Sequence, residues 1–194
     1  MRMNAEKVKI YPLSALTVII LFAFNPPEYV GVMLMCALLH EAGHLIAMRI
    51  MGVKHGKITV TPLGADIKMN GMYGYGQDMI IYISGAAANF FGALCAYFVY
   101  LGYPSTLVMF IIISNLFYAF FNMLPVRGLD GGGFCEALLM KSCQPDTAWK
   151  ICGVLSCISM LMLLCLSLFL IFASGTNFSL LLIILYLFVG LTKK

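Results

Sequence analysis

The sequence predicts an all-α polytopic membrane protein, with about six transmembrane helices and a short β-hairpin between the second and third helices. Hydrophobic residues make up 62% of the 194 residues and charged residues only 10%, which is more apolar surface than one soluble globule can bury. Several apolar stretches approach or exceed the roughly 20 residues needed to cross about 30 Å of hydrocarbon. We expect a single membrane-embedded domain over residues 1–194.

The expected spans follow from these apolar stretches in chain order. They are residues 8–24, 29–50, 79–101, 105–124, 149–173 and 178–191. The first has a short uncharged core after a basic start, as in a signal peptide, but no small-residue cleavage site precedes the Asn25-Pro26-Pro27 turn. We therefore interpret it as an uncleaved anchor. The last two spans form C-terminal helices over residues 149–191.

Positive charge is distributed unevenly along this layout. All 12 Lys and Arg residues fall in or beside alternate segments, whereas the loops at 25–28, 102–104 and 174–177 carry none. Because basic residues are retained on the cytoplasmic side of membranes, both termini are predicted to be cytoplasmic. The net charge of +4 then fits an anionic inner leaflet, and no soluble basic module indicates a nucleic-acid partner.

Two of the three histidines belong to a HExxH motif in the second span, formed by His40, Glu41 and His44. Residues four apart stack on one face of a helix, so both imidazoles can bind one zinc ion with Glu41 beside them. The alternative is a pair of buried histidines hydrogen-bonded to carbonyl groups. Cys36 is excluded as a further ligand, because positions 36 and 44 are about 12 Å apart along a helix axis.

A zinc ion held by two histidines still lacks the third protein ligand of a catalytic site. Asp130 is the candidate, because Pro125 must end the preceding apolar helix and the glycines at 131–133 let the backbone turn tightly near a ligand. The alternative is that Asp130 caps a helix over residues 131–139. Glu136 is the second candidate ligand.

The break after the fourth span also involves Asn122. Irregular backbone at membrane depth is tolerated only where it is buried in protein or lines a water-filled cavity, so we expect residues 122–133 to line one. The Asn122 amide is a candidate catalytic group that would help to hold a developing oxyanion. The alternative, of equal weight, is a hydrogen bond between neighbouring helices.

Residues 52–76 connect the second and third spans. They contain two strand patterns, at 57–61 and 65–69, around Pro62-Leu63-Gly64. The sequence therefore predicts a short hairpin in this connection.

A HExxH motif in one transmembrane helix, followed by an NxxPxxxxDGG segment after a later one, resembles the site-2 protease family of intramembrane zinc metalloproteases. The residues that carry the resemblance are His40, Glu41, His44, Asn122, Pro125, Asp130 and Gly131. The resemblance implies two histidines and one aspartate on zinc, a glutamate general base, and cleavage of membrane-embedded or membrane-proximal helical segments. The catalytic core would be residues 29–139.

The segment from Ser84 to Asn89 looks like a looser version of the family's Gly-Pro-x-x-Asn element, with Ala86 in place of proline. Tight packing of Gly85 and the alanines explains it without a role for Asn89. The six-span layout resembles the compact bacterial branch that includes the sporulation processing protease, without a PDZ or CBS domain. We accordingly expect a multi-pass protein of a bacterial cell membrane.

These patterns together predict a zinc metalloendopeptidase that hydrolyses a peptide bond in or near a transmembrane segment of a membrane protein or membrane-associated peptide, within the lipid bilayer. Zinc makes water nucleophilic near neutral pH, and Glu41 can take the proton. A strand edge of the hairpin could hold the unwound substrate, or the hairpin could only connect two helices. Inhibitory membrane partners are compatible with this function.

Two other classes of protein remain open. A metal-binding permease would use the same His and Asp residues to conduct an ion. A membrane adaptor without catalytic activity could keep the same motif. Glu41 discriminates the first alternative from the protease, because it would be a further ligand in a permease and a base in a protease.

Overall fold

The computed structural model describes residues 8–10, 12–61, 64–70 and 74–174, together with positions 181, 184, 185, 187 and 188. The chain divides into two compact units, Met1–Phe121 and Asn122–Lys194. The single domain expected from the sequence stays a prediction.

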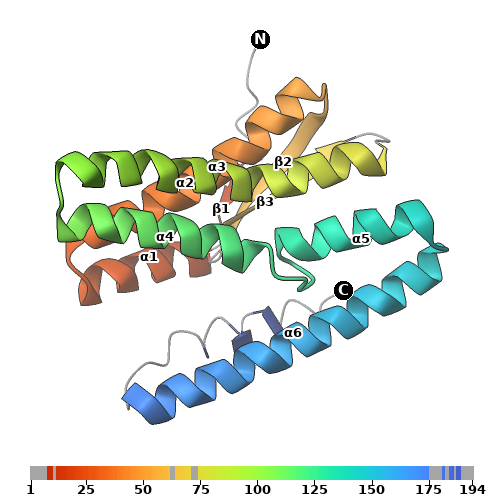
Figure 1. Ribbon diagram of the computed structural model, residues 1–194. Coiled ribbons are helices and arrows are strands. Elements are labelled where there is room, and N and C mark those ends of the chain that lie inside the picture. Colours follow the sequence, from red (N-terminus) through yellow and green to blue (C-terminus); the bar gives the residue numbers. More distant parts are fainter. Residues whose placement is uncertain are drawn as a thin grey trace. The chain divides into compact units, whose positions relative to one another are not determined.

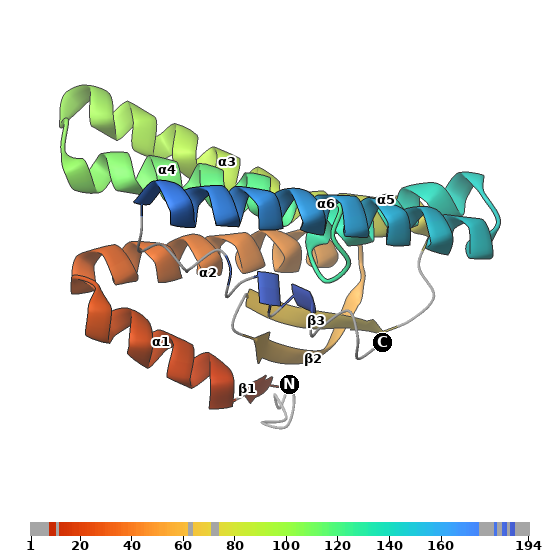
Figure 2. The same ribbon diagram turned by 90° about the horizontal axis from the view of Figure 1, so that it is seen from below.

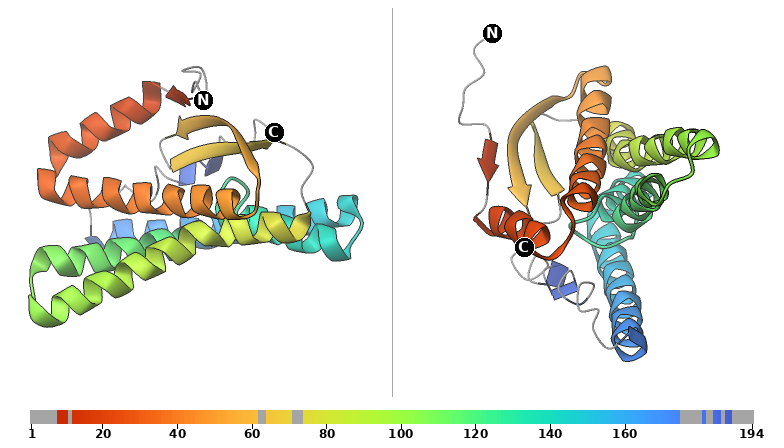
Figure 3. Two further views of the ribbon diagram at one scale, coloured as in Figure 1. Left: turned by 90° about the horizontal axis from the view of Figure 1, so that it is seen from above. Right: turned by 90° about the vertical axis from the view of Figure 1, so that its left-hand side faces the viewer.

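The first unit combines helices with a small sheet. Its elements are β1 (Val8–Ile10), α1 (Pro12–Phe24), α2 (Pro27–Ile50), β2 (Lys54–Thr61), β3 (Gly64–Asn70), α3 (Tyr75–Gly102) and α4 (Thr106–Asn122), the last of which ends at the boundary between the units. Helices α3 and α4 run antiparallel, joined by a short loop (Figure 1). The sheet and α1 lie on one side of α2, and α3 and α4 lie on the other (Figures 2 and 3).

The sheet has the strand order β1-β2-β3. Strands β2 and β3 are antiparallel, with Lys54 opposite Asn70 and Thr61 opposite Gly64, and the predicted strands 57–61 and 65–69 lie inside them. Strand β1 pairs in parallel with β2, with Val8 opposite Ile58. Sequence reasoning missed β1, because a parallel pairing depends on a distant segment of the chain.

The start of the first predicted span, residues 8–24, is therefore wrong. The helix begins at Pro12 instead, and Val8–Ile10 form a strand. Proline is favoured in the first turn of a helix, and β-branched residues such as Val8 and Ile10 favour strands. Helix α1 has 13 residues and a length of about 20 Å, which is shorter than the hydrocarbon core.

Three of the described helices are long and apolar enough to cross a membrane: Pro27–Ile50, Tyr75–Gly102 and Pro145–Ala173. They correspond to the predicted spans 29–50, 79–101 and 149–173 and support a membrane protein. Helix α4 is apolar but shorter, with 17 residues. The predicted span 178–191 lies largely outside the described residues. The total of six spans stays a prediction.

Small residues bring α2 and α3 close together. A Cβ atom at Gly43 would lie 2.5 Å from the Ser84 carbonyl oxygen and 2.8 Å from the Ala88 Cβ. Larger side chains could not be placed there without moving the helices apart. The α2 surface that faces α3 also carries His40 and His44, both buried, so this close packing determines the surroundings of the HExxH motif.

The second unit contains α5 (Asp130–Ser142) and α6 (Pro145–Ser174). Arg127, in the loop before α5, donates a backbone hydrogen bond to the Ser156 hydroxyl (3.0 Å) on α6. Its guanidinium donates to the Trp149 carbonyl oxygen and lies 3.7 Å from the centroid of the Trp149 ring. The Ser156 hydroxyl donates to the Pro125 carbonyl oxygen (3.3 Å). These contacts attach the loop before Asp130 to α6.

Candidate metal centre

The HExxH motif lies in the middle of α2, as the sequence predicted. The side chains of His40 and His44 are 5% and 7% exposed. Their ring centroids are 4.8 Å apart, with an angle of 83° between the ring planes, and the two Nε2 atoms are 3.2 Å apart. The helix therefore directs the same nitrogen of both rings toward one point.

The hydrogen bonds of Asn89 determine the tautomer of His40. The Asn89 amide nitrogen donates to the Cys36 carbonyl oxygen (3.0 Å) and to the Asn115 Oδ1 atom (2.9 Å). A carbonyl oxygen only accepts, so the orientation of the Asn89 amide is fixed and its Oδ1 atom faces His40 Nδ1 at 2.7 Å. His40 must therefore carry its proton on Nδ1 when it is neutral.

The backbone determines the tautomer of His44 in the same way. Its Nδ1 atom lies 2.7 Å from the Ile81 carbonyl oxygen, which can only accept a hydrogen bond. The Ser84 hydroxyl donates to the same carbonyl (2.6 Å) and lies 3.4 Å from His44 Nδ1. Neutral His44 also carries its proton on Nδ1, which leaves the lone pair on Nε2.

The Nε2 pair fits a divalent metal ion. Two lone-pair nitrogens cannot hydrogen-bond to each other, yet they are held 3.2 Å apart. With Zn–N bonds of about 2.0–2.1 Å and a tetrahedral angle of about 109°, two ligand nitrogens lie roughly 3.3 Å apart. Metal-binding histidines commonly donate the other ring N–H to a protein oxygen, as both rings do here. The alternative of two histidines that only bond to carbonyl groups explains the Nδ1 contacts, and a shared metal ion explains the short distance between the two Nε2 lone pairs as well.

Gly85 leaves room on α3 for the two imidazoles. A Cβ atom at this position would lie 2.5 Å from His44 Nε2, and 2.7 Å from both Nε2 and Cε1 of His40. Any side chain at position 85 would therefore occupy space next to both candidate ligand atoms. The lack of a side chain at Gly85 therefore lets both imidazoles lie against α3.

Two further side chains surround the pair within the first unit. Glu41 follows His40 on α2 and is partly buried. The ring of Tyr118 on α4 is tilted toward His40, with 6.5 Å between ring centroids. Cys36 contributes its backbone carbonyl to the Asn89 amide, and its side chain was excluded as a ligand by spacing.

The remaining predicted site residues belong to the second unit. Asn122 is the last residue of α4, and Asp130 is the first residue of α5. The N-cap of α5 is Leu129 and the helix begins at Asp130, so Asp130 lies one residue after the N-cap position that the alternative gave it. Cβ atoms at Gly131 and Gly132 would lie 2.2 Å from backbone oxygens of the preceding loop, and these glycines therefore let the loop fold tightly beside Asp130. The role of Asp130 in a metal site is a proposal, made below.

Sequence reasoning missed the contribution of Asn89. Its side chain is 0% exposed and bonds directly to His40, whereas tight packing alone was expected to explain the segment. An asparagine among small residues in an apolar helix was the available signal, because a buried amide needs partners. Gly85 in the same segment was expected to serve packing only.

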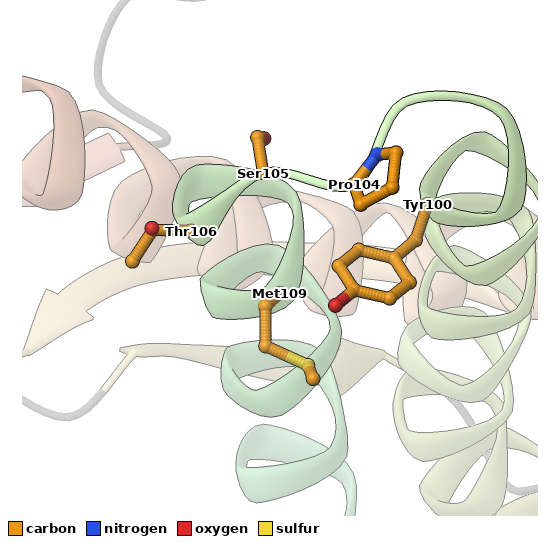
Figure 4. Close-up of a pocket in the computed structure, with 5 residues that line it drawn as sticks. All are labelled: Tyr100, Pro104, Ser105, Thr106 and Met109. Atoms are coloured by element: carbon orange, nitrogen blue, oxygen red, sulfur yellow. The ribbon is translucent and has the colours of Figure 1, made fainter.

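One hollow in the described surface lies away from the histidines. It has a volume of about 400 Å³ and is lined by Tyr100, Pro104, Ser105, Thr106 and Met109, with Tyr100 and Met109 pointing into the space between α3 and α4 (Figure 4). Tyr100 is eleven residues beyond Asn89 on α3, about 16 Å along the helix. Its lining offers neither carboxylate nor imidazole, so the histidine pair is the stronger candidate site.

The long apolar helices indicate a membrane protein. The buried histidine pair on α2 is its candidate metal centre. The fold is similar to a solved structure, the site-2 protease from Methanocaldococcus jannaschii, with a TM-score of 0.72 and 22% sequence identity over 99% of this chain and 93% of that chain. No protein-family model matches the chain, and no curated protein matches its sequence. The resemblance to site-2 proteases is thereby confirmed for the fold.

Proposed function

We propose that this protein is an intramembrane zinc endopeptidase, which hydrolyses a peptide bond in or near a transmembrane segment of a membrane-associated substrate. The observation that carries the proposal is the pair of Nε2 atoms 3.2 Å apart, with both Nδ1 atoms facing oxygen atoms. This arrangement suits a shared divalent cation, because ionisable groups in apolar helices are costly unless they serve a site.

Asp130 is the proposed third ligand. His40, His44 and Asp130 each offer one ligand atom of a type that binds zinc. The likeness to a site-2 protease fold supports this set, and so does the tight loop that precedes Asp130. A bound zinc ion supplies Lewis acidity, which makes water a nucleophile near neutral pH and polarises a carbonyl group.

Glu41 is the proposed general base. It is adjacent to His40 on α2, so it can accept a proton from water near the histidine pair and deliver it to the departing amine. Asn122 is the proposed donor to the developing oxyanion. The substrate must unwind to expose its peptide bond, and an edge of the β1-β2-β3 sheet is the proposed place where an extended segment pairs.

The depth of the site is consistent with an intramembrane reaction. Helix α2 ends at Ile50, just after Arg49. His44 lies roughly 7 Å and His40 roughly 13 Å along the helix from Arg49. With both termini in the cytoplasm, as the basic residues predict, the site would lie below the inner surface of a bacterial cell membrane. We also propose the compact branch of the family, with six spans in one domain.

The test compares wild-type protein with Glu41→Gln and with Glu28→Gln. Glu28 is an exposed acid in the first turn of the same helix and serves as the matched control. Each is co-expressed with candidate single-span substrates, and fragments and bound zinc are measured. Wild type and Glu28→Gln should give fragments that a chelator abolishes, whereas Glu41→Gln should keep zinc and give none.

Two outcomes would contradict the proposal. Equal fragments from wild type and Glu41→Gln would exclude Glu41 as the base. Zinc flux through reconstituted protein, with no fragments from any variant, would favour the permease, in which Glu41 is another ligand.

A further inference from the structure

Asn115 is a buried amide on α4 for which the proposed chemistry has no direct use. Its side chain is 3% exposed. Its Oδ1 atom accepts a hydrogen bond from Asn89 (2.9 Å), and its own amide nitrogen donates to the Ile111 carbonyl oxygen (3.0 Å). A Cβ at Gly92 would lie 3.0 Å from Asn115 Oδ1, so α3 is shaped to admit this amide.

The Ile111 carbonyl fixes the orientation of Asn115. Because this oxygen only accepts, the Asn115 nitrogen must face it, and the Asn115 oxygen must face Asn89. Asn89 then has an acceptor for each of its two amide hydrogens, Cys36 on α2 and Asn115 on α4. Helices α2 and α4 thus together fix the orientation of the Asn89 amide on α3.

A reversed Asn89 amide would change His40. The Asn89 oxygen would then face the Cys36 and Asn115 oxygens. The Asn89 nitrogen would donate to His40 Nδ1, whereas in the structure the Asn89 oxygen accepts from that atom. The His40 proton would then move to Nε2, and a protonated Nε2 cannot bind a metal ion. The Asn115 oxygen is one of only two described groups that oppose this reversal.

We propose that Asn115 is a positioning residue for the metal centre. It acts through Asn89 to keep His40 in the tautomer with its proton on Nδ1, so that the Nε2 lone pair points toward His44. The role of Asn115 in metal binding rests on the proposed function, whereas its control of the His40 tautomer does not.

The experiment uses full-length protein in detergent micelles, with Asn115→Leu as the main variant. Leucine has similar size and removes both hydrogen bonds. Asn115→Asp keeps an acceptor oxygen toward Asn89 and serves as the conservative variant. Ser114→Ala removes a neighbouring buried hydroxyl on α4 and is the matched control. Circular dichroism and thermal unfolding identify any variant that does not fold.

The first measurement is the tautomer of His40 in metal-free protein labelled with ¹⁵N-histidine, at a pH where the imidazole is neutral. Two-bond proton-nitrogen correlations distinguish a proton on Nδ1 from one on Nε2, and His40→Gln assigns the signal. We expect Nδ1–H in wild type, Asn115→Asp and Ser114→Ala, and a mixture of tautomers in Asn115→Leu.

The second measurement is the zinc dissociation constant, from competition with a chelator. Groups that contact a metal-binding histidine typically change affinity by about 10–100-fold, and a residue one contact further away should act near the lower limit, about tenfold. The zinc affinity of Asn115→Leu should therefore be about tenfold weaker than that of wild type, whereas Asn115→Asp should keep the wild-type affinity.

Unchanged tautomer and affinity in folded Asn115→Leu would overturn the proposal, and so would an equal loss in Ser114→Ala. If Asn115→Leu does not fold, Asn115→Ala replaces it and should show the same mixture of tautomers, and unchanged Nδ1–H there would overturn the proposal. A loss of Nδ1–H in Asn115→Asp would also contradict the role of the acceptor. Wild-type protein that binds no zinc, but whose His40 tautomer responds to Asn115, would refute the proposed function and leave the control of the tautomer standing.

Discussion

The Nε2 atoms of His40 and His44 lie 3.2 Å apart, while the opposite nitrogen of each ring is held by an oxygen of α3. Helix α2 supplies the spacing, and α3 supplies the orientation. The pair is therefore preorganised for a metal ion by two helices whose approach depends on Gly43 and Gly85.

Gly85→Ala should prevent metal binding while the helices still form. The added Cβ would lie within 2.7 Å of both Nε2 atoms, so at least one ring must leave its position. We expect zinc affinity to fall by more than about 100-fold, beyond the range typical of groups that only contact a ligand. Chelator competition gives the affinity, and circular dichroism reports the helix content.

The matched control is Gly31→Ala on α2, where an added Cβ would meet no atom within 4 Å. Alanine is the better helix former by up to about 1 kcal/mol, so this variant should be neutral or slightly more stable. Equal zinc affinity in Gly85→Ala and wild type would show that the ion does not bind between these rings.

Asp130→Ala should also lower zinc affinity by more than about 100-fold, because it removes the proposed third ligand. Glu136→Gln, in the same helix, tests the second candidate and should leave the affinity unchanged. Metal content of the purified variants and chelator competition provide the measurement. The reverse result, with a loss only in Glu136→Gln, would assign the third ligand to Glu136.

Removal of zinc should lower the thermal stability of the protein. A ligand that binds only the folded state stabilises it by about 2.7 kcal/mol at a free concentration of 100 times the dissociation constant. The midpoint of thermal unfolding should therefore rise with added zinc in wild type. The same titration should leave Gly85→Ala unchanged, and a parallel rise in that variant would indicate that zinc binds elsewhere.

Ser156→Ala should destabilise the second unit. The Ser156 hydroxyl accepts from the Arg127 backbone and donates to the Pro125 carbonyl, and loss of these partners should cost about 1–3 kcal/mol. Ser167 is a matched serine on α6, 0% exposed, whose hydroxyl has no hydrogen-bond partner among the described residues. Ser167→Ala should be neutral or stabilising. Thermal unfolding in detergent compares the two, and equal midpoints would show that the Ser156 bonds contribute little.

Local patterns allowed much of the fold to be predicted. The helix of the HExxH motif was expected over residues 29–50 and is found over Pro27–Ile50, because a long apolar stretch and two prolines define it. The predicted strands lie inside β2 and β3. The parallel strand β1 was missed, since its partner is about 50 residues away in the chain and nothing local indicates it.

The surroundings of the histidines could be predicted only in part. Residues four apart on a helix had to share a face, so the His40 and His44 pair follows from the motif. The Asn89 contact depends on how α3 is placed against α2, and the Asn115 contact depends on α4 as well. A single sequence without this placement gives no reason to connect an asparagine with a histidine 49 positions away.

The most direct test of the metal centre is zinc-edge X-ray absorption on the Glu41→Gln protein, compared with its His40→Ala and His44→Ala derivatives. We predict imidazole nitrogen scattering from two ligands at about 2.0–2.1 Å, and the loss of one such ligand in each derivative. Zinc bound without imidazole scattering, or a spectrum unchanged by both substitutions, would contradict a metal ion shared by His40 and His44.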